Sequence, residues 1–151
     1  MPATTGLEQY LHEHIPVSRH LGVRVLAADH AGIRLGAPLA PNLNHRHTAF
    51  GGSLSAVAIL AAWSYLHHAL GGEGPAQRIV IQSNSIEYLA PATGDFEAYC
   101  QAPAPERWAL FERTLVRRQR ARLALDVEVT VGEQLVAQFH GQYVVLLTPA
   151  A

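Results

Sequence analysis

The chain has 151 residues, of which 49% are hydrophobic and 15% charged, and its formal net charge is −1. This size suits one domain with a substantial core, and the balanced charge argues against a nucleic-acid-binding surface. The single cysteine, Cys100, excludes an internal disulfide, and the first residues lack the apolar run of a signal peptide. We therefore expect one domain over residues 1–151, located in the cytoplasm and without a membrane span.

The N-terminal part of the chain predicts a short helix and then two strands. Leu7, Tyr10 and Leu11 recur at the spacing of one helical face. Further on, apolar residues from Ile33 to Leu39 alternate with Arg34 and Gly36, which is the period of a half-buried strand. The predicted ranges are a helix over Thr5–His14 and strands over Leu21–Ala28 and Ile33–Leu39.

The segment from Phe50 to Leu70 contains no Asp, Glu, Lys or Arg. A surface helix normally has a charged face, so a helix of this composition is either buried or crosses a membrane. Its three serines and two histidines, together with its short length, argue against a membrane span. Gly71 and Gly72 then end the helix, because glycine readily adopts the positive φ of a helix C-terminus. The rest of the chain is expected to wrap around this helix.

The second half of the chain predicts four strands and one helix. Pro105 suits a first helical position, and Trp108, Phe111 and Leu115 share a helical face up to Arg118. A strand over Leu110–Val116 is the alternative for this segment. Short turns between the strands favour antiparallel pairing, so the fold class is α+β with a sheet around the central helix. The predicted strands are Arg78–Leu89, Asp95–Ala102, Arg122–Val131 and Gln134–Leu147.

Three segments of the chain carry distinctive motifs: Asn44–Ala56, which contains Phe-Gly-Gly-Ser-Leu, then Ser85–Asp95, and Glu106–Trp108. Together they resemble a bacterial family of thioesterase-like proteins with the hotdog fold, found alone or behind an acetyltransferase domain. The resemblance implies an antiparallel sheet wrapped around a long apolar helix, and acyl-CoA or acyl-acyl carrier protein as ligand. It also implies a homodimer or a dimer of dimers with sites at the subunit interface. Some family members are associated with decarboxylation of malonyl-acyl carrier protein.

Thioester chemistry requires polarisation of the carbonyl oxygen, where negative charge develops. The first turn of a helix offers unpaired N–H groups at the positive end of its dipole. We therefore predict that the N–H of Gly51 or Gly52 faces the thioester oxygen. Asn44 either donates a second hydrogen bond or holds the loop. A Gly-Gly pair by itself would equally fit close packing at a helix entry, and the flanking motif favours a functional role.

Hydrolysis also needs a base or a nucleophile. Related hotdog thioesterases carry an Asp or Glu on the central helix, whereas Ala56–Leu60 contains no carboxylate here. The remaining bases are His45, His47 or a group from another strand or subunit. Loss of CO2 from a malonyl thioester needs no base to activate water, so decarboxylation fits the missing acid better. A non-catalytic thioester-binding module is a further alternative, and a hydratase is disfavoured because no Asp is followed five residues later by His.

Other polar residues extend the predicted site. No metal or cofactor is expected, because the His45-x-His47 spacing is weak and lacks nearby acidic or thiol ligands. Ser53 lacks the Gly-x-Ser-x-Gly context of a nucleophile. The arginines between positions 107 and 122 form either a solvated face or a landing site for CoA phosphates or an acidic carrier protein. The predicted substrate contacts are His47, Thr48, Phe50, Ser53, Ser85, Tyr88, Arg117 and Arg118.

Overall fold

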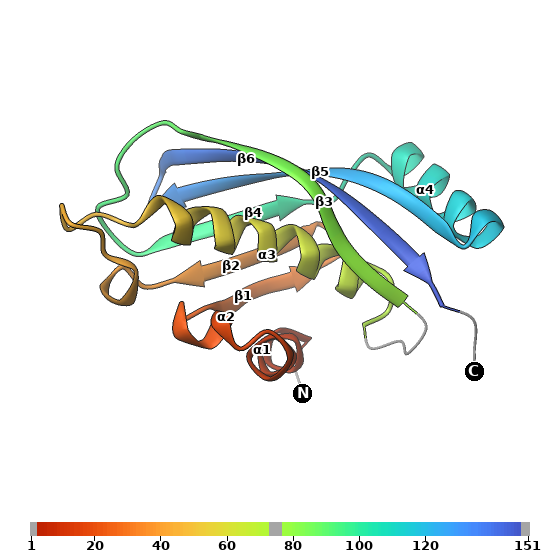
Figure 1. The fold of residues 1–151 in the computed structure, drawn as a ribbon, viewed down its shortest axis with the longest axis horizontal. Helices are drawn as coiled ribbons and strands as arrows, with labels where there is room; N and C mark the ends of the chain where they lie inside the picture. The colour runs from red at the N-terminus through yellow and green to blue at the C-terminus, as the bar shows by residue number, and fades with distance from the viewer. Residues whose placement is uncertain (1–2, 73–76, 149–151) are drawn as a thin grey trace.

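Six antiparallel strands form one sheet in the order β1-β2-β4-β5-β6-β3, and the sheet curls around the helix α3 (Figure 1). This computed structural model describes residues 3–72 and 77–148. The helices are α1 (Ala3–His14), α2 (Val17–His20), α3 (Gly51–Ala69) and α4 (Pro105–Arg118), with a 3₁₀ turn over Ala40–Asn42. The strands are β1 (Arg24–Asp29), β2 (Gly32–Ala37), β3 (Gln77–Tyr88), β4 (Phe96–Gln101), β5 (Arg120–Val131) and β6 (Gln134–Leu147).

The core lies between α3 and the concave face of the sheet. Val57, Ala61 and Leu66 of α3 are fully buried, and Tyr143 of β6 donates a hydrogen bond of 2.7 Å to the carbonyl of Ile59. A helix that is apolar nearly all round is stable only when other elements cover every side, and the curled sheet supplies most of that cover. This arrangement is the hotdog fold predicted from the sequence. In the described part of the chain, no helix is long and apolar enough to cross a membrane.

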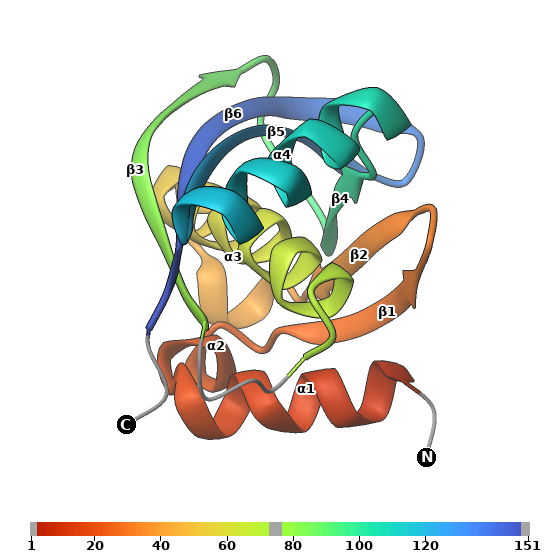
Figure 2. The ribbon, with the colours of Figure 1, turned by 90° about the vertical axis from the view of Figure 1, so that its right-hand side faces the viewer.

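Helix α1 lies beside β1 and contacts the C-terminal half of α3 (Figure 2). Tyr10 of α1 stacks on His67 of α3 at 4.5 Å between ring centroids, and His67 stacks in turn on Trp63 at 5.0 Å. The carboxylate of Glu8 accepts a hydrogen bond from the Val25 N–H, at the outer edge of the sheet. The first helix therefore packs on the end of α3 and protects the β1 edge of the sheet.

The prediction of a strand from Leu21 was wrong at its start. Residues Val17–His20 form the extra helical turn α2, and the N–H of Val23 bonds to the carbonyl of Ser18 at 2.9 Å. Because this backbone is engaged locally, strand pairing with β2 begins only at Arg24. The alternation of apolar residues did not reveal this turn.

The segment after β4 is the helix α4, and the alternative strand over Leu110–Val116 was wrong. Phe111 and Leu115 are buried, and Gln119 ends the helix in the left-handed conformation at φ 62°. Strand β4 pairs with β5 only as far as Val127, so the first half of β5 has a free edge. The helix packs along this edge, where Arg107 donates a hydrogen bond of 2.8 Å to the carbonyl of Ala124.

Strand β3 forms the other edge of the sheet, and no other described element packs along that edge. It is 12 residues long and pairs only with β6, with a bulge between Ile81 and Ser83. Residues 82–85 are all exposed, as are Val80 and Tyr88. Natural proteins rarely leave a long, regular edge strand unprotected, because its free N–H and C=O groups pair readily with another strand.

Cys100 lies on the core side of β4 and is fully buried. Burial, with a smaller contribution from the charge of Asp126, raises the pKa of its thiol to about 12. The thiol is therefore protonated and shielded at neutral pH, and it is a packing residue rather than a nucleophile.

Candidate functional site

The loop before α3 is organised by the side chain of Asn44. Its amide oxygen accepts hydrogen bonds from the N–H groups of Arg46, at 2.8 Å, and Thr48, at 3.2 Å. Its amide nitrogen donates to the Thr48 hydroxyl at 2.9 Å and, more weakly, to the Ala49 carbonyl at 3.4 Å. The loop turns at His47, which adopts a left-handed φ of 62°. Of the two predicted roles for Asn44, its contacts support that of holding the loop.

The first two N–H groups of α3 are unpaired. Phe50 precedes the helix, and its carbonyl accepts hydrogen bonds from Ser53 and Leu54 at 2.9 and 3.2 Å. Within the described residues, the N–H groups of Gly51 and Gly52 have no acceptor. They lie at the positive end of the helix dipole and are ready to bind an oxygen that carries negative charge.

Two aromatic rings flank this helix start. The ring of Phe50 packs so closely on Gly52 that a Cβ at position 52 would collide with it. The ring of Tyr88 would lie 3.4 Å from a Cβ at Gly51, and its hydroxyl donates a hydrogen bond of 3.1 Å to the Gly51 carbonyl. Phe50 and Tyr88 are 57% and 52% exposed, which is high for aromatic side chains. The contact with Phe50 explains the glycine at position 52, whereas position 51 has room for a Cβ.

An open cavity of about 400 Å³ adjoins the helix start. It brings together the end of the Asn44 loop, the first turn of α3 and the segment that follows β3. Backbone hydrogen bonds join these pieces, from Ala49 to the Ala92 carbonyl at 2.8 Å and from Phe50 to the Asn42 carbonyl at 2.7 Å. The lining residues are Asn44, Thr48, Ala49, Gly51, Leu54, Tyr88, Leu89, Ala90, Pro91 and Ala92.

Several of these lining residues were not among the predicted site residues. The segment from Leu89 to Ala92 reaches the cavity because it leaves the end of β3 and crosses the loop before α3. Only the pairing of Ala49 with Ala92, which are far apart in the sequence, places this segment at the site.

The lining of this cavity contains no carboxylate and no imidazole. His45 and His47 lie on the exposed part of the loop and do not line it. Ser53 is buried in the first turn of α3, also outside the lining. The cavity can therefore stabilise negative charge through N–H groups, but the predicted bases do not face it within one chain.

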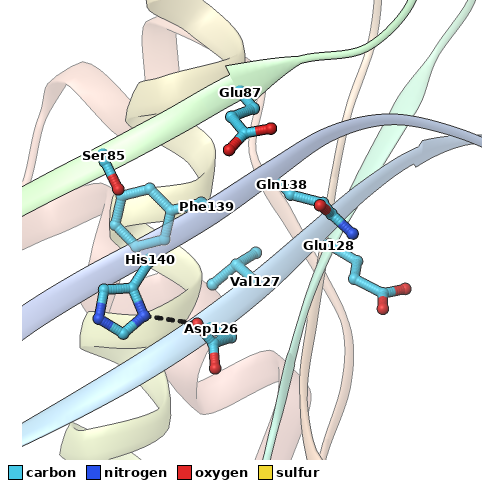
Figure 3. A pocket seen from close by; sticks show the side chains of 8 residues that line it. All are labelled: Ser85, Glu87, Asp126, Val127, Glu128, Gln138, Phe139 and His140. Atoms are coloured by element: carbon cyan, nitrogen blue, oxygen red, sulfur yellow. Dashed lines mark hydrogen bonds and ion pairs between the residues drawn. The ribbon is translucent and has the colours of Figure 1, made fainter.

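Ser85 lies on the opposite face of the sheet from this cavity. It is paired in register with His140, and His140 with Asp126, along three neighbouring strands. His140 Nδ1 is 2.7 Å from the Asp126 carboxylate (Figure 3). These residues line a separate cavity of about 300 Å³ on the outer face, together with Glu87 and Glu128. Ser85 and Tyr88 were predicted to contact one substrate, but side chains three positions apart on a strand point to opposite faces.

The two arginines predicted to contact substrate, Arg117 and Arg118, lie in the last turn of α4. Both are exposed, and neither lines the cavity beside α3, the cavity on the outer face of the sheet or the groove between α4 and β5. Figure 1 shows α4 at the opposite end of the molecule from the loop that precedes α3. Within one chain, these arginines are therefore remote from Gly51.

Comparisons with known proteins agree with this fold. Residues 4–147 match the family described as "Putative thioesterase (yiiD_Cterm)". A structure of a protein of unknown function from Chlorobaculum tepidum TLS is 30% identical, with a TM-score of 0.84 over 95% of this chain and 93% of that one. A "putative thioesterase" from Shewanella oneidensis is 31% identical, with a TM-score of 0.80 and 97% of each chain covered.

A protein of unknown function from Pseudomonas aeruginosa, described as a probable thioesterase, shares the fold at 24% identity, with a TM-score of 0.80. It covers 97% of this chain and 98% of its own. The family match spans nearly the whole chain, including the loop of Asn44, the start of α3 and strand β3. The chain therefore belongs to this thioesterase family of hotdog-fold proteins.

Proposed function

We propose that the chain is an enzyme that acts on acyl thioesters, on acyl-CoA or acyl-acyl carrier protein, at the cavity beside the start of α3. The observation that supports this proposal is the pair of unpaired N–H groups at Gly51 and Gly52, at a helix start where Gly51 lines an open cavity. In the proposed complex, these groups donate hydrogen bonds to the thioester oxygen. Negative charge grows on that oxygen during the reaction, so the donors stabilise the transition state more than the bound substrate.

Decarboxylation of a malonyl thioester is a second candidate reaction, favoured by the uncharged lining of the cavity. The bond between the carboxylate carbon and the α-carbon breaks, and CO2 leaves. The electron pair of that bond forms an enolate, whose oxygen accepts hydrogen bonds from the N–H groups. Water then protonates the α-carbon and gives the acetyl thioester. This reaction needs no base to activate water, whereas hydrolysis needs a base from His45, His47 or a second subunit.

The test is to incubate the purified protein with malonyl and with saturated acyl thioesters of CoA and of acyl carrier protein. The intact carrier is followed by mass spectrometry. Conversion of the malonyl form to the acetyl form supports decarboxylation, and release of the free thiol supports hydrolysis. If no thioester changes, the enzymatic proposal is wrong, and a non-catalytic thioester-binding module becomes the better account.

We further propose that the protein is a homodimer in which β3 pairs with β3 of a second copy. Two-fold antiparallel pairing must place side chains of the same sheet face opposite one another. With the bulge at the two-fold axis, Arg78 then faces Glu87 of the partner subunit and Ile79 faces Ile86 of the partner subunit. This register joins opposite charges on the outer face and apolar side chains on the inner face, and it occurs twice by symmetry.

Charge reversal at β3 tests this register. Arg78→Glu should weaken the dimer because it places a carboxylate opposite Glu87 of the partner subunit, and the double variant Arg78→Glu with Glu87→Arg should restore it. Sedimentation velocity over a range of concentrations measures the dissociation. Arg24→Glu, an exposed arginine on the opposite edge strand β1, is the control. The register would be contradicted if the double variant were monomeric, or if Arg78→Glu left the dimer dissociation constant unchanged.

A further inference from the structure

A groove of about 220 Å³ runs between α4 and the start of β5. It exists because β4 ends early and α4, rather than a strand, packs along the free edge of β5. Arg107 contributes from α4 and Arg122 from β5, with the Thr114 hydroxyl between them in the sequence. The other lining residues are Leu110, Phe111, Leu123 and Ala124.

The positive charge of this groove is not neutralised by the protein. Its lining contains no carboxylate. Among the arginines of the described residues, only Arg34 forms an ion pair, with Glu97 at 3.2 Å. Arg107 is held in place by its hydrogen bond to the Ala124 carbonyl and has further N–H donors left. The Thr114 hydroxyl is engaged, because it donates a hydrogen bond of 2.8 Å to the Leu110 carbonyl. Two guanidinium groups in a groove without acidic side chains are suited to a phosphate ester.

We propose that this groove binds the phosphate of the group that carries the acyl chain, either the nucleotide of CoA or the phosphopantetheine arm of a carrier protein. The inference rests on the proposed thioester function and assigns the arginines that serve it. Arg107 and Arg122 hold the phosphate, whereas Arg117 and Arg118 lie outside the groove. Leu110 is exposed and gives the groove an apolar surface that can contact the adjoining part of the ligand.

In the proposed β3–β3 dimer, the groove belongs to the thioester site of the partner subunit. Trp108 of α4 packs edge-on against Tyr65 of α3, at 5.8 Å between ring centroids. Tyr65 is 14 residues beyond Gly51, which corresponds to about 21 Å along the helix at 1.5 Å per residue. Two-fold antiparallel pairing through β3 reverses the second subunit, so its α4 lies at the end where the first subunit has Gly51. Each groove therefore serves the thioester site of the other subunit.

Binding of phosphate ligands to the unmutated protein provides the first test. Isothermal titration calorimetry with adenosine 3′,5′-bisphosphate, and separately with phosphopantetheine, distinguishes the two sources of the phosphate. Arg122→Gln should lower the affinity for the preferred ligand by about tenfold or more, which is the loss expected for one charge-assisted hydrogen bond. Arg118→Gln removes the same charge from a nearby exposed position and should leave the affinity unchanged. Equal losses in both variants, or no binding by the unmutated protein, would overturn the proposal.

Truncated substrates separate this proposal from the proposed function. An N-acetylcysteamine thioester carries the same acyl group without any phosphate. Arg122→Gln should raise KM for the CoA or carrier-protein thioester and leave the truncated thioester unaffected. If both substrates are affected equally, the groove does not recognise phosphate. If neither thioester turns over with the unmutated protein, the proposed function itself fails, while the calorimetric result still tests the groove.

Mixed dimers test the assignment to the partner subunit. A dimer with Gly51→Pro in one chain and Arg122→Gln in the other should keep one intact site, with the low KM of the unmutated protein. A dimer that carries both changes in the same chain should keep none. The opposite pattern would show that each groove serves its own chain.

Discussion

Replacement of Gly51 by proline should reduce kcat by about 10² to 10³, the loss found when one donor of an oxyanion hole is removed. Proline has no N–H, so the variant deletes one of the two free donors at the start of α3. The helix should survive, because proline is favoured at a first helical position where the N–H has no intrahelical partner. The preceding residue must be extended, and Phe50 already is, with φ −60° and ψ 131°.

The control for this variant is Gly51→Ala, which keeps the N–H. Its Cβ would lie 3.4 Å from the exposed Tyr88 ring, so the alanine needs at most a small shift of that side chain. We expect the alanine variant to retain most of the activity, with circular dichroism and thermal unfolding close to those of the unmutated protein for both variants. Normal turnover by a folded proline variant would show that the Gly51 N–H does not act on the thioester.

Replacement of Asn44 by alanine should reduce turnover by about 10²-fold, the effect of moving a catalytic group by roughly 1 Å. The change deletes every hydrogen bond that ties the side chain to Arg46, Thr48 and Ala49. The loop leads directly into Phe50 and the free N–H groups, so a relaxed loop misplaces the donors. Stability should fall by about 1–2 kcal/mol, in line with the loss of part-buried hydrogen bonds. Steady-state kinetics and urea unfolding measure the two effects.

Asn44→Asp distinguishes a loop-holding residue from one that contacts substrate. The aspartate oxygens can still accept from the N–H groups of Arg46 and Thr48, and the Thr48 hydroxyl can reverse to become the donor. If Asn44 only holds the loop, the aspartate variant should keep most of its turnover. If the Asn44 amide donates to the thioester, aspartate should be as damaging as alanine, and its negative charge would repel the developing oxyanion.

The absence of an Asp or Glu on α3 bears on whether the site catalyses hydrolysis or decarboxylation. Val57 and Ala58 face the core, fully buried, and no residue of the segment Ala56–Leu60 carries a charge. The described cavity lining adds none. A site with N–H donors and no base can hold an enolate, but it activates water poorly. This is why we keep decarboxylation as a second candidate beside hydrolysis.

Much of the fold was predictable from local patterns. The uncharged segment after Phe50 predicted a wrapped central helix, because such a helix cannot remain solvated on any side. The alternation of apolar and polar residues over Arg122–Val131 predicted β5 within two residues of its observed start. The start of β1 was mispredicted, because the helical turn Val17–His20 depends on backbone hydrogen bonds that leave little trace in apolar periodicity.

The sequence by itself determined the elements and the helix start that can polarise a carbonyl, since glycines, prolines and apolar periods act through local geometry. Only the tertiary structure decided which residues meet there. It separated Ser85 from Tyr88 by the two faces of β3 and placed the segment after β3 at the cavity. It also brought Arg107 and Arg122 to one groove and left Arg117 and Arg118 outside it, because a groove requires two elements that are packed side by side.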